Sequence, residues 1–174
     1  MNDGGKSFQG KNEVRQLYLD IMDVSKDSPR RTNPNGIYFS QFLDKQKKIK
    51  LILLDNRFSN DDYTWTDLIT GVHEENCNLG EAQSEWLKNE LESSTAEYTV
   101  IGAGVMMIPD DRFCEHFYKK TREFLMTIRN PKTKIFLISG DVHHAEFTQD
   151  LCSKHIHGYP IREFTSSGLT HGLA

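Results

Sequence analysis

The segment "FLISGDVHHAEF" places two carboxylates and two imidazoles directly behind an apolar run. Asp141 and His143 are two residues apart and follow Gly140, so a tight turn at the end of a strand can aim both side chains at one metal ion. Carboxylate and imidazole groups bind zinc, iron and manganese, and carboxylates also bind calcium. His144 and Glu146 are candidates for orienting a metal ligand or for moving a proton. The alternative is a capped strand end whose histidines only bind backbone atoms.

Two other predicted strands also end in polar residues. The run "IKLILLDNRF" ends at Asp55 and Arg57, and "IREFTSSG" ends at Ser166 and Ser167. In open α/β sheets the carboxyl ends of the strands line the crevice where ligands bind. The planar fork of Arg57 suits a phosphate, although an ion pair at a strand terminus is the alternative. A serine nucleophile acting with His171 is a further hypothesis, but the sequence has no G-x-S-x-G motif to support it.

The elements that would position these residues follow from the hydrophobic pattern. Apolar residues recur with helical spacing in three segments, 12–24, 81–91 and 110–130. Short apolar or alternating runs predict strands over 36–43, 49–58, 97–108, 134–138 and 161–168. Residues 59–78 are polar and irregular and predict a long surface excursion. Alternating helices and buried strands indicate a layered α/β fold.

Composition and charge exclude some classes of protein. The chain has 174 residues, which is the length of one domain, and its net charge is -4 with 21 scattered Lys and Arg residues. This balance argues against general nucleic-acid binding. The sequence contains no apolar run of about 18 residues, so no transmembrane segment is predicted. Its polar N-terminus does not have the pattern of a signal peptide.

Several segments together resemble a known family. They occur in the family's order: "GIYFSQF", "IKLILLDNRF", "LGEAQSEWLKNELESSTAEYTVIGAGV", "FLISGDVHHAEF" and "REFTSSGLTH". Over nearly its whole length the sequence resembles the PhoD-like family of metallophosphatases (alkaline phosphatase D). The resemblance implies a calcineurin-like metallophosphoesterase fold, an α/β/β/α sandwich in which two sheets pack face to face with helices outside. It also implies a metal centre that hydrolyses phosphomonoesters or phosphodiesters.

The resemblance assigns roles to individual residues. Asp141 and His143 match the family's Gly-Asp-x-His metal motif, and Asn2 matches the asparagine that follows its aspartate- and histidine-rich motif. These three residues are therefore expected metal ligands. From their own chemistry, independently of the resemblance, His144 is expected to assist proton transfer and Arg57 to contact the phosphate. The implied cofactors are divalent or trivalent metal ions, with calcium, iron, zinc and manganese all open.

The sequence departs from the family pattern at its start. It begins where the aspartate- and histidine-rich motif ends, so residues 1–174 are expected to form the C-terminal half of the domain. A two-metal centre needs ligands from both halves, and we therefore expect this chain alone to be inactive. A missing N-terminal half would leave open sheet edges and exposed apolar faces and would be a pairing partner. The alternative function is that of a non-catalytic half-domain acting as an interaction or regulatory module. The sequence predicts no compartment, although members of the family are often exported.

Overall fold

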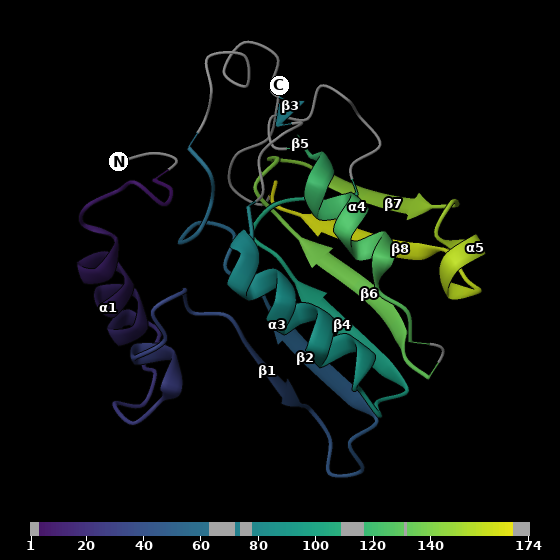
Figure 1. The fold of residues 1–174 in the computed structure, drawn as a ribbon, viewed down its shortest axis with the longest axis horizontal. Helices are drawn as coiled ribbons and strands as arrows, with labels where there is room; N and C mark the ends of the chain where they lie inside the picture. The colour runs from purple at the N-terminus through teal and green to yellow at the C-terminus, as the bar shows by residue number, and fades with distance from the viewer. Residues whose placement is uncertain (1–3, 63–71, 74–77, 109–116, 131, 169–174) are drawn as a thin grey trace.

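The chain is organised around one mixed β-sheet (Figure 1). The computed structural model describes residues 4–62, 72–73, 78–108, 117–130 and 132–168. The six-stranded sheet has the order β1-β2-β4-β6-β8-β7, and its strands are β1 (Phe39–Phe42), β2 (Ile49–Leu53), β4 (Tyr98–Gly102), β6 (Lys134–Ser139), β8 (Ile161–Ser166) and β7 (Ala145–Asp150). The four central strands are parallel, and both edge strands are antiparallel to their neighbours. The carboxyl ends of the four central strands therefore meet at one edge of the sheet.

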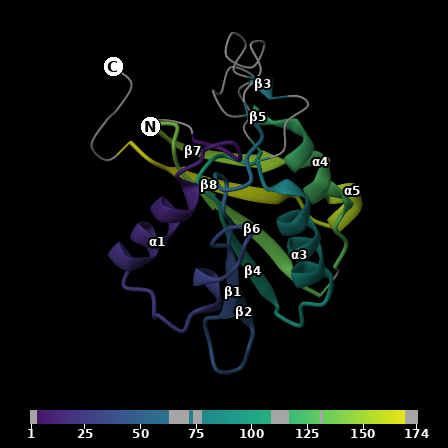
Figure 2. The same ribbon diagram turned by 60° about the vertical axis from the view of Figure 1, so that its left-hand side comes forward.

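Helices lie on both sides of this sheet. They are α1 (Lys11–Ile21), the 3-10 helix η1 (Pro29–Arg31), α3 (Gly80–Glu92), α4 (Lys119–Thr127) and the short α5 (Lys154–His157). Figures 1 and 2 show α3 and α4 against one face of the sheet, while α1 lies on the other side. A second sheet pairs β3 (Val72–His73) with β5 (Phe117–Tyr118). Among the described residues, none of the helices is long and apolar enough to cross a membrane.

Most predicted elements are confirmed, and two expectations are wrong in part. The helix expected over 110–130 is described from residue 117 onward, where Phe117–Tyr118 is a strand and the helix begins only at Lys119. The excursion expected over 59–78 contains the strand Val72–His73. Strand β7, whose sequence is "AEFTQD", was not predicted at all. β7 is an edge strand, and its burial alternates along the strand. Because it contains several polar residues, it lacks the continuous apolar run that is typical of a central strand.

The hydrophobic core fills the space between the sheet and helices α3 and α4. Alternate residues of the parallel strands face these helices, and Ile52, Ile101 and Leu137 are each 0% exposed on three neighbouring strands. Leu87 of α3 and Leu125 of α4 belong to the same cluster. Burying one such side chain fully contributes about 1.5–3 kcal/mol. This core holds the strand ends that carry the candidate site.

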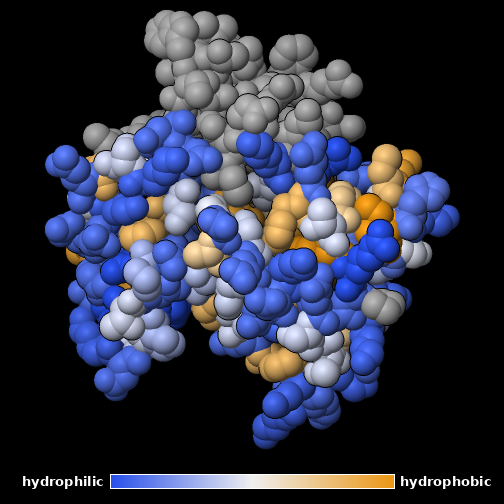
Figure 3. Space-filling view, viewed as in Figure 1, coloured by the Kyte–Doolittle hydropathy of each residue, from blue (hydrophilic) through white to orange (hydrophobic). Residues whose placement is uncertain are grey.

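The opposite face of the sheet is apolar and exposed. Several large hydrophobic residues on it are between 37% and 56% exposed: Ile49, Tyr98, Ile138, Phe147 and Phe164. The rings of Phe147 and Phe164 contact each other across β7 and β8, with centroids 4.9 Å apart. A groove of about 560 Å³ separates α1 from part of this face, and Figure 3 shows the surface indented between them. The exposed apolar face expected from the sequence is therefore present.

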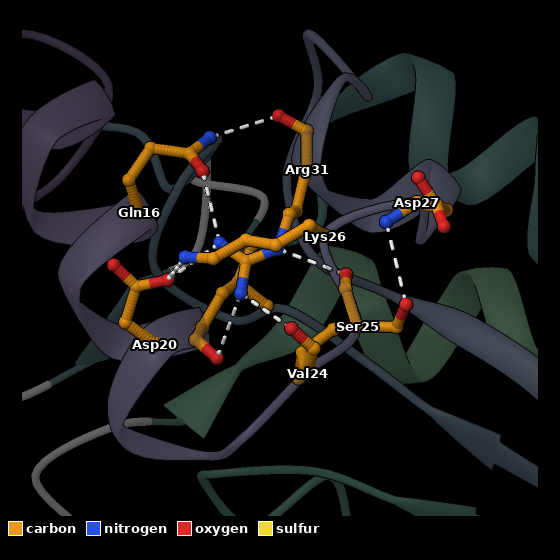
Figure 4. A network of polar contacts seen from close by, with 8 residues as sticks. Gln16, Asp20, Val24, Ser25, Lys26, Asp27 and Arg31 are labelled. Atoms are coloured by element: carbon orange, nitrogen blue, oxygen red, sulfur yellow. Dashed lines mark hydrogen bonds and ion pairs between the residues drawn. The ribbon is translucent and has the colours of Figure 1, made fainter.

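The end of α1 is held by Arg31, whose side chain is only 8% exposed (Figure 4). Its guanidinium donates to the carbonyl oxygens of the turn that ends the helix, which are those of Leu19, Val24 and Ser25. It also forms an ion pair with Asp20 at 2.8 Å. These contacts satisfy carbonyl groups that the helix end leaves without intrahelical partners. They join the C-terminal end of α1 to η1.

Candidate functional site

Residues that follow three strands line one pocket of about 400 Å³. Asp55, Asn56 and Arg57 follow β2, Gly104 follows β4, and Asp141 follows β6. The three strands are parallel neighbours, which brings their carboxyl ends to the same edge of the sheet. The expected convergence of the β2 and β6 ends is confirmed.

The turn after β6 has an unusual backbone. Asp141 has φ +77° and His143 has φ +58°, which is the left-handed region that residues with a side chain seldom adopt. Ser167, just beyond β8, holds this turn: its Oγ accepts the His143 N–H at 2.7 Å, and its own N–H donates to the His144 carbonyl at 3.2 Å. A Cβ added at Gly168 would lie 2.9 Å from the His143 carbonyl oxygen, so the two segments are in close contact. Strained backbone of this kind clusters at functional sites.

Two candidate metal ligands lie on this turn. The side chains of Asp141 and His143 are exposed at the strand end, and a carboxylate with an imidazole is a donor set that suits zinc, iron or manganese. Asn2, the third expected ligand, lies outside the described residues, as does His171. No group of three or more His, Cys, Asp or Glu residues able to hold a metal occurs within the described part of the chain. The described residues therefore fit a metal only as a partial ligand set.

His144 lies on the same turn, and both of its ring nitrogens contact oxygen atoms. Nδ1 is 2.8 Å from the carbonyl oxygen of Val142, and Nε2 is 2.9 Å from a carboxylate oxygen of Glu146. A carbonyl and an ionised carboxylate only accept hydrogen bonds, so this geometry suits a ring that carries a proton on each nitrogen. The arrangement gives His144 a fixed orientation beside the candidate ligands.

Asp55 shapes the turn that carries Arg57. Its carboxylate accepts hydrogen bonds from the backbone N–H groups of Arg57 at 3.0 Å and Phe58 at 2.9 Å, and from Ile37 at 3.0 Å. Gly36 has φ +132°, and a Cβ there would lie 2.8 Å from the Asp55 carboxylate, so this approach requires glycine. Asp55 therefore shapes the turn at Arg57 through hydrogen bonds from the backbone.

Gln83 supports the same strand end from α3. Its side chain is buried, and its Nε2 donates to the Asp55 carbonyl at 2.7 Å while its Oε1 accepts the Asp55 N–H at 2.8 Å. Trp86, one turn later, packs on Tyr38 with ring centroids 4.6 Å apart. Both residues therefore pack in the N-terminal half of α3.

Two buried polar residues near the site were not singled out from the sequence. Asn56 is 6% exposed, and its Oδ1 accepts the Gly104 N–H at 2.8 Å. Glu163 is 0% exposed and accepts the N–H groups of Met107 at 2.9 Å and Ile108 at 2.8 Å. Burial raises the pKa of the Glu163 carboxyl. The available signals were an asparagine shortly after an apolar strand and a glutamate at an inward position of "IREFTSS".

Comparison with known proteins agrees with this arrangement. The family model described as PhoD-like phosphatase matches residues 4–173. The solved structure of PhoD matches with a TM-score of 0.67 and 18% sequence identity, covering 98% of this chain and 38% of the PhoD chain. No curated protein matches the sequence. The structural match confirms the layered α/β fold and takes in only part of the PhoD chain. Because the family model spans all but four of the 174 residues, the chain belongs to the PhoD-like phosphatase family.

Proposed function

We propose that the complete domain to which this chain contributes hydrolyses phosphomonoesters or phosphodiesters with the help of metal ions. One observation carries the proposal: Asp141, a candidate metal ligand, and Arg57, a candidate phosphate ligand, line the same pocket. Membership of the PhoD-like phosphatase family supports phosphate chemistry at this pocket. The chain covers 38% of the PhoD chain, so the activity is proposed for the complete domain and this chain alone is expected to be inactive.

In this proposal Asp141, His143 and Asn2 hold metal. A bound metal would lower the pKa of a coordinated water and neutralise charge that develops on the phosphoryl oxygens. The ligand types fit calcium, iron, zinc or manganese. Three ligands leave the coordination spheres of two metal ions unfilled, so further ligands must come from the rest of the domain.

Arg57 and His144 act on the substrate. The Arg57 guanidinium would bind two phosphate oxygens at once, and the Asp55 carboxylate fixes the backbone that carries it. In this proposal His144, whose Nε2 lies 2.9 Å from Glu146, would turn from this contact and donate a proton to the leaving alcohol. Glu146 would keep the ring oriented and stabilise its protonated form.

The exposed apolar face of the sheet is the proposed contact surface for the N-terminal half. Tyr98, Ile138 and Phe164 lie on this face and are each more than 40% exposed. Contiguous apolar surface of this kind marks an interaction site. A half-domain packed there would lie beside the strand ends and could supply the remaining metal ligands.

The test uses the complete protein with added metal ions and two substrates, p-nitrophenyl phosphate and bis(p-nitrophenyl) phosphate. We expect hydrolysis of at least one substrate and its loss in His143→Ala. The matched control is His155→Ala, which removes an exposed histidine from α5. Full activity in His143→Ala would contradict the assigned ligand. Hydrolysis by the purified 174-residue chain, abolished by His143→Ala, would contradict the expectation that this chain is inactive alone.

A non-catalytic interaction module is the second candidate function. It is favoured by the incomplete ligand set among the described residues and by the exposed apolar face. Metal analysis of the purified complete protein separates the two functions. A metal-free protein that binds no added metal supports the interaction module, whereas metal lost in His143→Ala supports the enzyme.

A further inference from the structure

We propose that the pocket beside Asp141 binds a second negatively charged group of the substrate, a carboxylate or another phosphate, through Lys11, Arg15 and Asn56. This inference rests on the proposed function and narrows its substrate class. The reacting phosphate would lie near Asp141 and Arg57, and the rest of the ester would extend toward α1. All five residues line the same pocket.

The pocket lies between the end of β2 and the first two turns of α1. Residues on the α1 side provide both apolar and basic groups, namely Phe8, Lys11, Val14, Arg15 and Tyr18. The opposite wall is formed by the residues that follow β2, including Phe58. A volume of about 400 Å³ is within the range of small-molecule sites. The apolar side chains would contact the carbon skeleton of the ester, and the basic groups its charge.

The two basic residues of α1 have no carboxylate partner in the part of the chain that the structure describes. Lys11 and Arg15 are four residues apart, so they lie on the same face of the helix, where like charges repel each other. Both lie beside the Phe58 ring, at 4.4 Å for the Lys11 Nζ and 5.1 Å for the Arg15 Cζ. Throughout the described part of the chain, neither forms an ion pair with an acidic side chain.

Other basic residues of the same region are paired. Lys6, just before α1, contacts Asp61 at 2.5 Å, and Lys26, just after it, contacts Asp20 at 2.5 Å. Lys11 and Arg15 differ from these two neighbours in that no ion pair with a carboxylate is found for them among the described residues. An anionic ligand would supply the missing countercharge and remove the repulsion between them.

The hydrogen-bonding groups around the pocket point to the same kind of ligand. The Lys11 ammonium has three N–H groups, and it donates to two carbonyl oxygens, those of Lys6 at 3.0 Å and Phe58 at 3.3 Å. Arg15 donates to the Asn33 carbonyl, but its buried Nε has no partner among the described residues. The Nδ2 of Asn56 is likewise buried without a partner in this part of the chain. The unused groups are all donors, and carboxylate and phosphate oxygens are pure acceptors.

The Asn56 amide has a defined orientation. Its Oδ1 accepts the Gly104 N–H at 2.8 Å, so its Nδ2 is the atom left to donate. A buried donor without a partner is unfavourable, and a ligand oxygen that accepts from it recovers the lost interaction. The pocket thus combines two unpaired cations with an unsatisfied amide donor, next to the candidate phosphate site.

The first experiment compares two esters of similar size and shape, one with a carboxylate and one with a neutral amide. They are 4-carboxyphenyl phosphate and 4-carbamoylphenyl phosphate, tested on the complete, metal-loaded protein. We expect kcat/KM to be about tenfold to a hundredfold higher for the carboxylate, the range for charge-assisted hydrogen bonds. The ratio should fall toward 1 in Lys11→Met and in Arg15→Met. The control, Lys26→Met, removes a paired lysine outside the pocket and should keep the wild-type ratio. Equal kcat/KM values in the wild type would overturn the inference and leave the proposed function intact.

The second experiment needs no hydrolysis. Calorimetry measures the affinity of the complete protein for 4-carboxybenzylphosphonate and for benzylphosphonate, neither of which can be hydrolysed at its C–P bond. We expect the carboxylated compound to bind at least tenfold more tightly, and this preference to be lost in Lys11→Met. If no ester is hydrolysed but the preference is present, the proposed function fails while the pocket assignment holds. Equal affinities of the wild-type protein for the two phosphonates would overturn the assignment. This comparison does not depend on the folding of any variant.

Discussion

The Oγ of Ser167 accepts a hydrogen bond from the backbone N–H of His143 at 2.7 Å, and this bond joins the end of β8 to the turn after β6. His143 has φ +58°, a conformation that is maintained only where surrounding contacts hold it. Ser167 therefore serves as a support for the candidate metal-binding turn. This contact gives the hydroxyl a structural role, in contrast to the nucleophile considered from the sequence alone.

The support role of Ser167 predicts the effect of removing its hydroxyl. Ser167→Ala leaves the His143 N–H without its partner and loosens the turn, so metal affinity of the complete protein should fall about tenfold or more. The free energy of unfolding should fall by only about 1 kcal/mol, because one hydrogen bond is lost. Metal titration and urea denaturation measure the two effects. Ser166→Ala, which changes the exposed neighbour, is the control, and equal metal affinity in both variants would contradict the role.

Gln83 provides a second prediction, on stability. Its amide exchanges two hydrogen bonds with the backbone of Asp55, at 2.7 Å and 2.8 Å, in a buried position. Gln83→Leu would leave both backbone groups unsatisfied and should lower the free energy of unfolding by about 3 kcal/mol. Urea denaturation measures the change. Glu85→Ala, at an exposed position of the same helix, should change the free energy of unfolding by less than about 0.5 kcal/mol. A similarly small effect for Gln83→Leu would show that its two hydrogen bonds to Asp55 do not stabilise the fold.

The strand ends could be located from the sequence because two simple patterns coincide there. Continuous apolar runs identified β2 and β6, and each run stops at charged residues, Asp55 and Asp141. Parallel pairing then brings these ends together without any further information. A ligand-binding crevice at these strand ends could therefore be predicted without any knowledge of side-chain contacts.

The remaining features of the site depend on tertiary contacts that leave little trace in a sequence. The positive φ at His143 is maintained by Ser167, which is 24 residues away. The buried carboxylate of Glu163 is tolerated because the backbone at Met107 and Ile108, more than 50 residues away, donates to it. Neither pairing follows from hydrophobic periodicity, which reports only which face of an element is buried.

Glu163 gives a prediction on pH dependence. Burial, with a smaller contribution from the nearby charge of Glu146, raises the pKa of its carboxyl above the ordinary value of 4.5. Between 4.5 and the raised value the folded protein binds more protons than the unfolded chain, so stability falls as pH rises through this window. Below the window the contribution of Glu163 is constant.

Glu163→Gln removes this titration. The free energy of unfolding of the wild type, measured relative to Glu163→Gln by urea denaturation, should therefore increase as pH is lowered from 8 toward about 4.5. The difference between the two proteins isolates Glu163 from other titrating groups. A difference that stays constant over this range would show that the Glu163 pKa is not raised.

Phe164 tests whether the rest of the domain covers the apolar face of the sheet. In this chain its side chain is 49% exposed and contacts Phe147. If the face stays exposed in the complete protein, Phe164→Ser should lower the free energy of unfolding by less than about 1 kcal/mol. If another half-domain packs there, the substitution leaves a cavity with a polar group in it, and the loss should be about 3 kcal/mol or more. Leu137→Ala, which truncates a fully buried core residue, provides the reference loss of about 2–5 kcal/mol. We expect the loss of unfolding free energy for Phe164→Ser to approach this reference. A small loss would argue for the interaction module, in which the apolar face stays exposed until a separate partner binds.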